Sequence, residues 1–193
     1  NQRLRDLKAR GGPSVHGVEI DERTHAVTST LLGTEFGMPP DHLKRADFFA
    51  IEPCELPAMT AVVGNPPFIR YQRFAGADRD RALRRAAAQG VDLSKLASSW
   101  APFVVHSTAF LAPGGRIAMV LPQELGHASY ARPVLTFLAK NFAHLYLVTF
   151  QRALFPHLNE DTLLLLAEGR RIEVAREFDA ATLMQLISLL ECR

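Results

Sequence analysis

The stretch TAVVGNPPFIRY, residues 60–71, joins a short apolar run to a rigid turn. Asn65-Pro66-Pro67 follows the apolar residues without any intervening polar segment. Proline fixes its own φ, lacks an N–H group and drives the residue before it out of the α region. The stretch therefore predicts a buried strand over 60–64 that ends in a stiff, extended exit at Asn65.

Short apolar runs recur along the chain and alternate with helical patterns. Buried strands are predicted at 15–20, 46–51, 60–64, 116–122, 145–150 and 162–169. Helices are predicted at 21–32, 98–111 and 131–142, where apolar residues recur at three- and four-residue spacing. The alternation predicts an α/β fold. In the segment 112–116, APGGR, we expect a helix stop in which Gly114 or Gly115 takes a positive φ.

The composition is that of an ordinary globular protein. The 193 residues are 48% hydrophobic and 22% charged, and the formal net charge of +2 does not by itself indicate a polyanionic partner. Cys54 and Cys192 form no CxxC pair and the histidines have no metal-binding spacing, so neither a disulfide framework nor a metal site is predicted. No apolar run approaches the ~18 residues of a membrane span, and no signal peptide is recognisable at the start. We expect a soluble protein of the reducing cytoplasm.

Residues 70–97 depart from the core pattern because basic side chains crowd a largely polar segment. The basic residues are Arg70, Arg73, Arg79, Arg81, Arg84, Arg85 and Lys95. One interpretation is a solvated helix with i,i+3 and i,i+4 charge pairs. The other is contact with phosphates, which the interleaved aromatic rings of Tyr71 and Phe74 favour.

The Asn-Pro-Pro-Phe turn has chemistry of its own. Ligands of open α/β sheets bind beyond the carboxyl ends of the strands, where this turn is predicted to lie. The side-chain carbonyl of Asn65 and the backbone carbonyl of Pro66 are two acceptors in a rigid frame, and Phe68 offers a flat apolar face. Such a set suits a planar group that bears an –NH₂, such as adenine. Accepting both amine hydrogens would favour the pyramidal, nucleophilic form of a nitrogen whose lone pair is otherwise delocalised.

Four segments resemble successive motifs of the N6-adenine DNA methyltransferases of restriction-modification systems, in the order of the γ-type enzymes. They are ADFFAIEP (46–53), AVVGNPPFIRY (61–71), FLAPGGRIAMVLP (110–122) and LFPHLNED (154–161). The resemblance implies a Rossmann-like fold that uses S-adenosyl-L-methionine, with a mostly parallel sheet and an antiparallel last strand. The catalytic domain would span 1–169, and 170–193 would open a following helical element or linker.

The resemblance also implies a set of cofactor contacts. Glu19, with Ile20 beside it, matches the acidic residue that binds the ribose hydroxyls of the cofactor. Asp47, with Phe48 beside it, matches the acceptor for the adenine amine of the cofactor, and Asn65 also adjoins the cofactor. A solvated carboxylate at Glu19 and a turn-forming role for Asp47 remain as alternatives.

On the target side, the resemblance assigns Asn65, Pro66 and Pro67 to the acceptor turn for the target amine. Phe68 and Phe155 would stack against the flipped base. The alternatives are a simple Asx-turn at Asn65 and a core position for Phe155. The residues expected to contact DNA are Arg70, Tyr71 and Arg73.

The sequence departs from the family at both ends. The first strand and the Gly-rich cofactor loop of the family would precede Asn1, and no target-recognition domain follows Glu168, so we expect the middle of a larger enzyme. Because the family's strand order is 3-2-1-4-5-7-6, the absent strand would lie between 15–20 and 60–64. We expect these two strands either to pair directly or to receive a strand from a partner chain. The isolated chain should then bind S-adenosyl-L-methionine weakly or not at all.

Three functions remain open from the sequence. The favoured one is methylation of the N6 amine of a flipped adenine in double-stranded DNA, with a restriction or specificity subunit or domain as a candidate partner. The others are a protein-glutamine N5 methyltransferase and a non-catalytic DNA-binding or assembly fragment. The Pro53-Cys54 pair resembles the nucleophile of cytosine-C5 methyltransferases but lacks their surrounding glycine-proline sequence. We therefore expect Cys54 to be an ordinary buried or loop cysteine.

Overall fold

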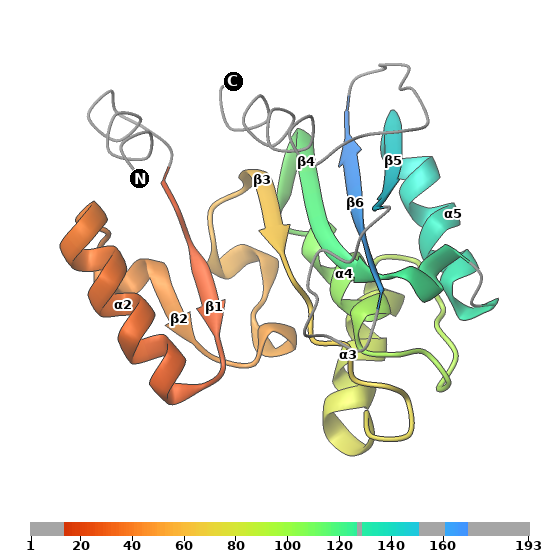
Figure 1. The fold of residues 1–193 in the computed structure, drawn as a ribbon, viewed down its shortest axis with the longest axis horizontal. Helices are drawn as coiled ribbons and strands as arrows, with labels where there is room; N and C mark the ends of the chain where they lie inside the picture. The colour runs from red at the N-terminus through yellow and green to blue at the C-terminus, as the bar shows by residue number, and fades with distance from the viewer. Residues whose placement is uncertain (1–13, 127–128, 151–160, 170–193) are drawn as a thin grey trace. The chain divides into compact units, whose positions relative to one another are not determined.

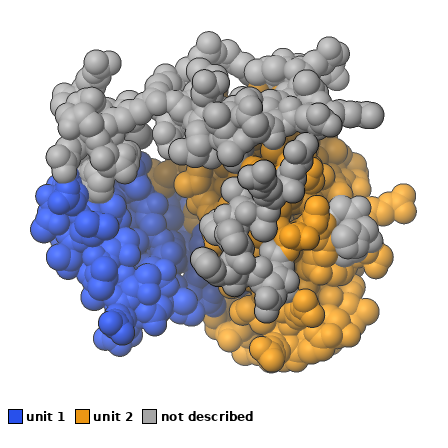
Figure 2. All heavy atoms as spheres, in the orientation of Figure 1, with its two compact units in different colours: residues 1–56 blue, residues 57–193 orange. Residues whose placement is uncertain are grey.

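The computed structural model describes residues 14–126, 129–150 and 161–169. The chain divides into two compact units, Asn1–Leu56 (unit 1) and Pro57–Arg193 (unit 2), which Figure 2 distinguishes by colour. Each unit has a sheet of its own, and each is described separately below.

Unit 1 is a small α/β unit. Strands β1 (Gly17–Glu19) and β2 (Leu43–Arg45) pair in parallel, and helix α2 (Glu22–Phe36) connects them (Figure 1). The carboxylate of Asp21 caps α2 by accepting from the Thr24 N–H at 2.7 Å, and this hydrogen bond lowers the pKa of Asp21. Gly37, with a φ of 56°, ends the helix in the left-handed region that glycine tolerates.

The described residues of unit 1, from 14 onward, also form three short 3₁₀ turns. They are η1 (Pro40–His42), η2 (Phe48–Ala50) and η3 (Pro53–Glu55). The η1 turn leads directly into β2, and the η2 and η3 turns come after β2. Beyond its carboxyl end, β1 thus leads through Ile20 and Asp21 into α2, whereas β2 leads into the η2 and η3 turns.

Unit 2 holds a four-stranded mixed sheet in the order β3-β4-β6-β5 (Figure 1). The strands are β3 (Met59–Gly64), β4 (Leu111–Pro122), β5 (His144–Thr149) and β6 (Thr162–Glu168). Strand β4 is parallel to β3, whereas β6 runs antiparallel to both β4 and β5. The antiparallel last strand that the sequence predicted is thus confirmed, and the neighbour order equals the 4-5-7-6 half of the expected sheet.

In the described part of unit 2, three helices and two 3₁₀ turns accompany this sheet. They are α3 (Gly76–Ala88), α4 (Trp100–Thr108), η4 (Gln123–Gly126), η5 (Ser129–Ala131) and α5 (Arg132–Asn141). Helix α4 is apolar nearly all round because it packs against β4, α3 and α5 at once. Strand β6 is buried on both faces, which explains its unbroken run of apolar residues.

Most of the predicted elements are confirmed, with shifted ends. The strands at 15–20, 60–64, 145–150 and 162–169 and the helices at 21–32, 98–111 and 131–142 all have observed counterparts. Strand β4 begins five residues before the predicted start at Arg116, because Leu111 already pairs with Met59. The register then shifts before Arg116 pairs with Ala61, and Gly114 takes a φ of 78° within this irregularity. The positive φ expected in this glycine pair lies at Gly114, but within β4 rather than at a helix stop, because α4 already ends at Thr108.

Two predictions about the sheet are wrong. Residues 46–51 form no strand: the strand ends at Arg45, and the carboxylate of Asp47 accepts from the Phe49 N–H at 3.0 Å, which turns the chain into η2. Direct pairing of the segments 15–20 and 60–64, the first of the two arrangements expected for them, does not occur, because β1 and β3 belong to different sheets. A strand from a partner chain stays a prediction.

Candidate active site

The Asn-Pro-Pro-Phe loop lies where β3 ends, as predicted. Asn65 follows the last strand residue, Gly64, and its side chain is exposed. Pro66 is buried, whereas Pro67 is exposed. Phe68 is half-buried and packs against the main core of unit 2. The loop therefore has an anchored side, formed by Pro66 and Phe68, and presents the amide of Asn65 to solvent.

Ser99, at the start of α4, holds the loop through three hydrogen bonds. Its hydroxyl accepts from the Ile69 N–H at 2.9 Å and donates to the backbone carbonyl of Pro67. Its own N–H donates to the carbonyl of Ile69 at 3.0 Å. Sequence reasoning missed this residue, because a serine at a helix start usually signals an N-cap and carries no trace of a partner thirty residues away.

The backbone of β3 approaches β4 closely just before the loop. Gly64 is the register partner of Met119, and a Cβ atom on Gly64 would lie 2.9 Å from the Met119 sulfur. A larger residue would force the Met119 side chain or the strand backbone to shift at the position that leads into Asn65. Glycine at position 64 thus lets β3 stay closely packed against β4 up to the Asn65 loop.

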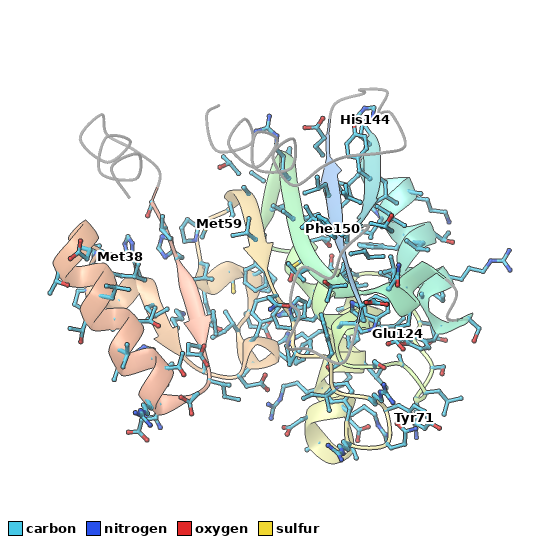
Figure 3. The ribbon with its side chains drawn as sticks, in the orientation of Figure 1. Met38, Met59, Tyr71, Glu124, His144 and Phe150 are labelled. Carbon is cyan, nitrogen blue, oxygen red and sulfur yellow. The ribbon has the colours of Figure 1, made fainter. Side chains whose placement is uncertain are left out.

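A buried polar network lies at the carboxyl end of β4, next along the sheet from the loop. Glu124 accepts hydrogen bonds from the Trp100 indole N–H at 3.1 Å and from the Tyr130 hydroxyl. The Tyr130 and Ser98 hydroxyls are 3.1 Å apart. Burial and the hydrogen bond to Glu124 raise the pKa of Tyr130, so it stays a neutral donor. Figure 3 shows Glu124 at the opposite end of this sheet from His144.

The antiparallel strand β6 contributes to the same edge. The Gln123 N–H donates to the carbonyl of Asp161 at 2.9 Å, and Pro122 is the register partner of Thr162. The end of β4 and the start of β6 are thus tied together beside the carboxyl end of β3. Chain segments from three strands meet there, as expected for a ligand site of an open α/β sheet.

The predicted cofactor residues lie at the carboxyl edge of the sheet in unit 1. Glu19 ends β1, and its backbone carbonyl accepts from the Ala46 N–H at 3.1 Å, one residue before Asp47. Glu19 also accepts from the Asp21 N–H at 2.8 Å through its carboxylate. The structure thus brings Glu19 and Asp47 to one edge. Asp47 is also the turn-former of the alternative interpretation, since it caps η2.

Carboxylates suit the hydroxyl and amine donors of S-adenosyl-L-methionine. A carboxylate offers about four lone-pair sites, so one bond to a backbone N–H leaves capacity for a ligand donor. Beside these groups, Ile20 is 67% exposed and Phe48 is half-buried, which makes apolar surface available next to the acidic pair. The chemistry of the residues present at this edge therefore fits the nucleoside part of such a cofactor.

The expected DNA contacts lie on an exposed turn directly after the loop. The N–H groups of Arg73 and Phe74 both donate to the carbonyl of Arg70 at 2.9 Å. Phe74 is buried and anchors the turn, whereas Arg70, Tyr71 and Arg73 are exposed. The turn therefore presents two guanidinium groups and a ring to solvent a few residues from Asn65.

The remaining basic residues of 70–97 belong mainly to helix α3. An i,i+3 pair joins Arg81 to Asp78 at 3.8 Å, which agrees with the solvated-helix interpretation for this part of the segment. The buried faces of Ala82 and Ala86 hold the helix on unit 2. The two interpretations of the basic segment thus apply to different parts of it, with phosphate contact left as the hypothesis for the turn.

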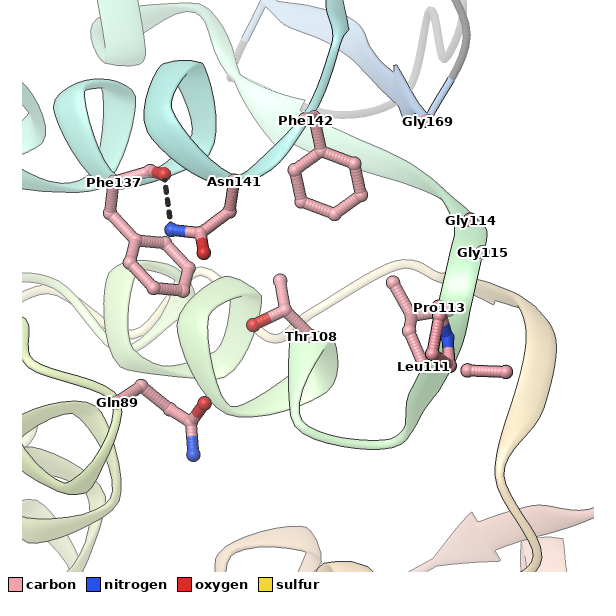
Figure 4. A pocket seen from close by; sticks show the side chains of 11 residues that line it. Gln89, Thr108, Leu111, Pro113, Gly114, Gly115, Phe137, Asn141, Phe142 and Gly169 are labelled. Atoms are coloured by element: carbon pink, nitrogen blue, oxygen red, sulfur yellow. Dashed lines mark hydrogen bonds between the residues drawn. The ribbon is translucent and has the colours of Figure 1, made fainter.

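A pocket of about 390 Å³ lies at the other end of the sheet of unit 2 (Figure 4). Its lining residues come from the start of β4, the end of β6 and the carboxyl ends of α3, α4 and α5. In Figure 4 the Asn141 side chain donates to the Phe137 carbonyl, at 2.8 Å, on the pocket wall. Since the strands of open sheets bind ligands at their carboxyl ends, this pocket is separate from the candidate active site.

The remaining predictions from the sequence concern Phe155, the C-terminal segment, metal binding, Cys54 and membrane spans. Phe155 and the segment 170–193 lie outside the described residues. In the described ranges no cluster of three metal-ligating side chains occurs, and Cys54 is an exposed free cysteine of η3. None of the helices in those ranges has the length and apolarity needed to cross a membrane.

Comparison with known proteins identifies methyltransferases. No family model matches the chain. The type II methyltransferase M.XhoI of Xanthomonas vasicola is 25% identical over 144 residues, which cover 68% of this chain and 25% of that protein. The chain thus spans about a quarter of the length of this curated relative.

Three solved structures share the fold. A type I restriction-modification methyltransferase subunit of Streptococcus thermophilus has a TM-score of 0.65 at 15% identity, covering 98% of this chain and 45% of its own. A protein of Listeria monocytogenes assigned to the class I S-adenosylmethionine-dependent methyltransferases has a TM-score of 0.62 at 15% identity, covering 97% and 58%. The type IIL restriction-modification enzyme MmeI, in complex with DNA, has a TM-score of 0.59 at 14% identity, covering 85% of this chain and 26% of that one.

The chain therefore has the fold of the class I S-adenosylmethionine-dependent methyltransferases. Its sequence is similar to that of a type II methyltransferase. The Rossmann-like α/β class expected from the sequence is confirmed by these structures and by the strand order of unit 2.

Proposed function

We propose that this chain carries the target-base site of a DNA methyltransferase that transfers a methyl group from S-adenosyl-L-methionine to the N6 amine of a flipped adenine. The observation that carries the proposal is the Asn65-Pro66-Pro67-Phe68 loop. It leaves the carboxyl end of β3 with the Asn65 amide exposed and with Ser99 bonded to the backbone on both sides of Phe68. A rigid loop with two acceptors and a ring is the set that a planar amine requires.

The acceptors act on the geometry of the amine. The Asn65 side-chain carbonyl and the Pro66 backbone carbonyl would each accept one amine hydrogen, which favours a pyramidal nitrogen whose lone pair is no longer delocalised into the ring. The bound cofactor supplies an electrophilic methyl group on sulfur. The amine nitrogen would form the new N–C bond with that lone pair as the S–C bond breaks, and it would then lose one proton. Pro67 would keep the two carbonyl acceptors in a fixed relative orientation, because its ring fixes its own φ.

Two rings would hold the base. Phe68 packs on the core from one side, so its ring would be a fixed platform for stacking, a contact worth ~1–3 kcal/mol per base. Phe155 is proposed, from the sequence motif alone, as the second ring. Extruding a paired adenine costs a few kcal/mol, which such stacking would offset.

The cofactor is assigned to the acidic edge of unit 1. Glu19, with Ile20, would bind the ribose hydroxyls, and Asp47, with Phe48, would accept from the cofactor's own adenine amine. Asn65 would adjoin the methyl-bearing end. The shared edge position of Glu19 and Asp47 supports this assignment.

Double-stranded DNA is the proposed partner. The exposed turn of Arg70, Tyr71 and Arg73 would contact phosphates next to the flipped base. The relation in fold to MmeI, solved in complex with DNA, supports this choice. We also propose two further partners: a restriction or specificity subunit or domain, and a chain that donates a strand. The proposed location is the cytoplasm.

The test is methylation by the purified protein that contains this chain. Duplex DNA of mixed sequence and isotope-labelled S-adenosyl-L-methionine are incubated with the wild type and with Asn65→Ala, and nucleosides are separated by mass. We expect label in N6-methyladenine from the wild type only. Label in a glutamine side chain of added protein would favour the N5 alternative, and cofactor binding absent by calorimetry would favour the non-catalytic one.

A further inference from the structure

We infer that Ser99 is a positioning residue that sets the orientation of Phe68, and through it the stacking platform for the target base. This inference rests on the proposed function and assigns it a residue outside the Asn-Pro-Pro-Phe motif. Ser99 lies at the start of α4, about thirty residues further along the chain than the loop it holds.

The hydrogen bonds of Ser99 bracket Phe68. The hydroxyl donates to the carbonyl of Pro67, which belongs to the peptide unit before Phe68, and accepts from the N–H of Ile69, which belongs to the unit after it. The Ser99 N–H adds a bond to the Ile69 carbonyl at 3.0 Å. Fixing the peptide planes on both sides of a residue fixes its φ and ψ, and therefore the direction of its Cα–Cβ bond.

Ser99 does not act as a side-chain N-cap, which is the usual role of a serine at the start of a helix. An N-cap serine adopts extended backbone angles and bonds to the N–H groups of the first helical turn. Ser99 instead has helical angles, a φ of −59° and a ψ of −28°, and makes no side-chain cap bond. It is also only 1% exposed. Its hydroxyl therefore serves the loop rather than the helix.

The flanking residues keep Ser99 in place. Trp100 is fully buried and its indole N–H is bonded to Glu124, while the Ser98 hydroxyl lies 3.1 Å from the Tyr130 hydroxyl. Residues 98–100 are thus tied to the chain segment that follows β4. The position of the loop after β3 is set in this way from the end of the neighbouring strand.

The inference predicts a loss of rate without a loss of binding. Misplacing a positioned group by about 1 Å can cost on the order of 10²-fold in rate. In Ser99→Ala we expect kcat to fall about 10- to 100-fold, with the KM values for DNA and for S-adenosyl-L-methionine within about threefold of wild type. The matched control is Ser107→Ala on the same helix, whose buried hydroxyl donates at 2.8 Å to the Phe103 carbonyl and does not touch the loop.

Amide hydrogen exchange of the 193-residue chain tests the same inference without activity. The Ile69 amide should exchange at least about tenfold faster in Ser99→Ala than in the wild type or in Ser107→Ala. Unchanged exchange at Ile69, or an unchanged kcat in a folded Ser99→Ala protein, would overturn the inference. A wild type that shows Ser99-dependent protection but methylates nothing would instead count against the proposed function.

A second pair of variants covers the case in which Ser99→Ala does not fold. Threonine and valine have nearly the same shape, but only threonine keeps a hydroxyl that can both donate and accept. We expect Ser99→Thr to retain protection of the Ile69 amide and a higher kcat than Ser99→Val. Equal exchange rates and equal kcat values in the two variants would show that the hydroxyl has no positioning role.

Discussion

Gly64 and Met119 are register partners across β3 and β4, and a Cβ atom on Gly64 would lie 2.9 Å from the Met119 sulfur. Met119 is buried, so its side chain has little room to withdraw. The two residues therefore constrain each other immediately before the Asn65 loop begins.

Replacing Gly64 with alanine should destabilise unit 2 by about 1–3 kcal/mol, because overpacking forces side chains or backbone to shift. Urea unfolding measures the change. The control is Gly33→Ala in α2, where the nearest atom to a new Cβ is 4.0 Å away and alanine should be neutral or stabilising. If Gly64→Ala costs as much in a Met119→Ala background, the contact with Met119 is not the cause.

Replacing Asn65 with alanine should lower kcat by about 10²–10³-fold, the scale for losing one preorganised polar group, with little change in cofactor affinity. Steady-state methylation and calorimetric titration of S-adenosyl-L-methionine measure the two quantities. Gln72→Ala removes an amide that is also exposed, seven residues further along, and should leave kcat unchanged. Near-normal turnover in Asn65→Ala would exclude the acceptor role.

Replacing Arg73 with alanine should weaken DNA binding and make it less dependent on salt. Each phosphate contact that is lost should reduce the slope of log K against log[salt] by about one. Fluorescence anisotropy at several salt concentrations gives this slope. Lys140→Ala is the control, because Lys140 is exposed in the last turn of α5, at the end of the sheet away from Asn65. Equal slopes for Arg73→Ala and wild type would remove Arg73 from the interface.

Replacing Tyr130 with phenylalanine should change the alkaline limit of stability. Burial and the bond to Glu124 raise the pKa of Tyr130 in the folded protein. The stabilisation from the neutral phenol is therefore complete below the unfolded pKa of about 10 and is lost as pH rises through the folded pKa. Urea unfolding between about pH 8 and pH 11 should show a shallower alkaline decline in Tyr130→Phe than in the wild type.

Glu124→Gln offers an independent check on this assignment. It keeps a hydrogen-bond acceptor for Tyr130 and removes the negative charge that opposes ionisation of the phenol. The alkaline decline should then be intermediate between those of the wild type and Tyr130→Phe. A decline identical in all three proteins would assign the alkaline limit to other groups.

Local pattern predicted the fold well where one physical cause dominates. Strand β6 could be predicted because burial on both faces demands an unbroken apolar run. The same rule failed at 46–51, where Phe48 and Phe49 are apolar but lie in a 3₁₀ turn. The Asp47 carboxylate accepts from the Phe49 N–H, and the Asp47 carbonyl accepts from the Ala50 N–H. Apolar character reports burial, and it does not distinguish a strand from a capped turn.

The sequence predicted the part of the candidate site that consists of consecutive residues. Asn65 to Phe68 are adjacent in sequence, so their acceptors and ring could be recognised together. The hydrogen bonds of Ser99 and the network of Glu124 join residues that tertiary packing brings together, and they leave no periodic signal. Their discovery required the structure.

The reversed direction of β6 has a consequence for how such a protein can diversify. Thr149 is the register partner of Leu163, and Pro122 that of Thr162, so the connection from β5 to β6 leaves and re-enters the sheet at the edge that carries the Asn65 loop. Doubling the length of a connection between two fixed ends costs only about 0.6 kcal/mol in closure entropy. Insertions and deletions in the connection from β5 to β6 should therefore change substrate choice with little loss of stability in the sheet. We expect natural or laboratory evolution to vary this connection.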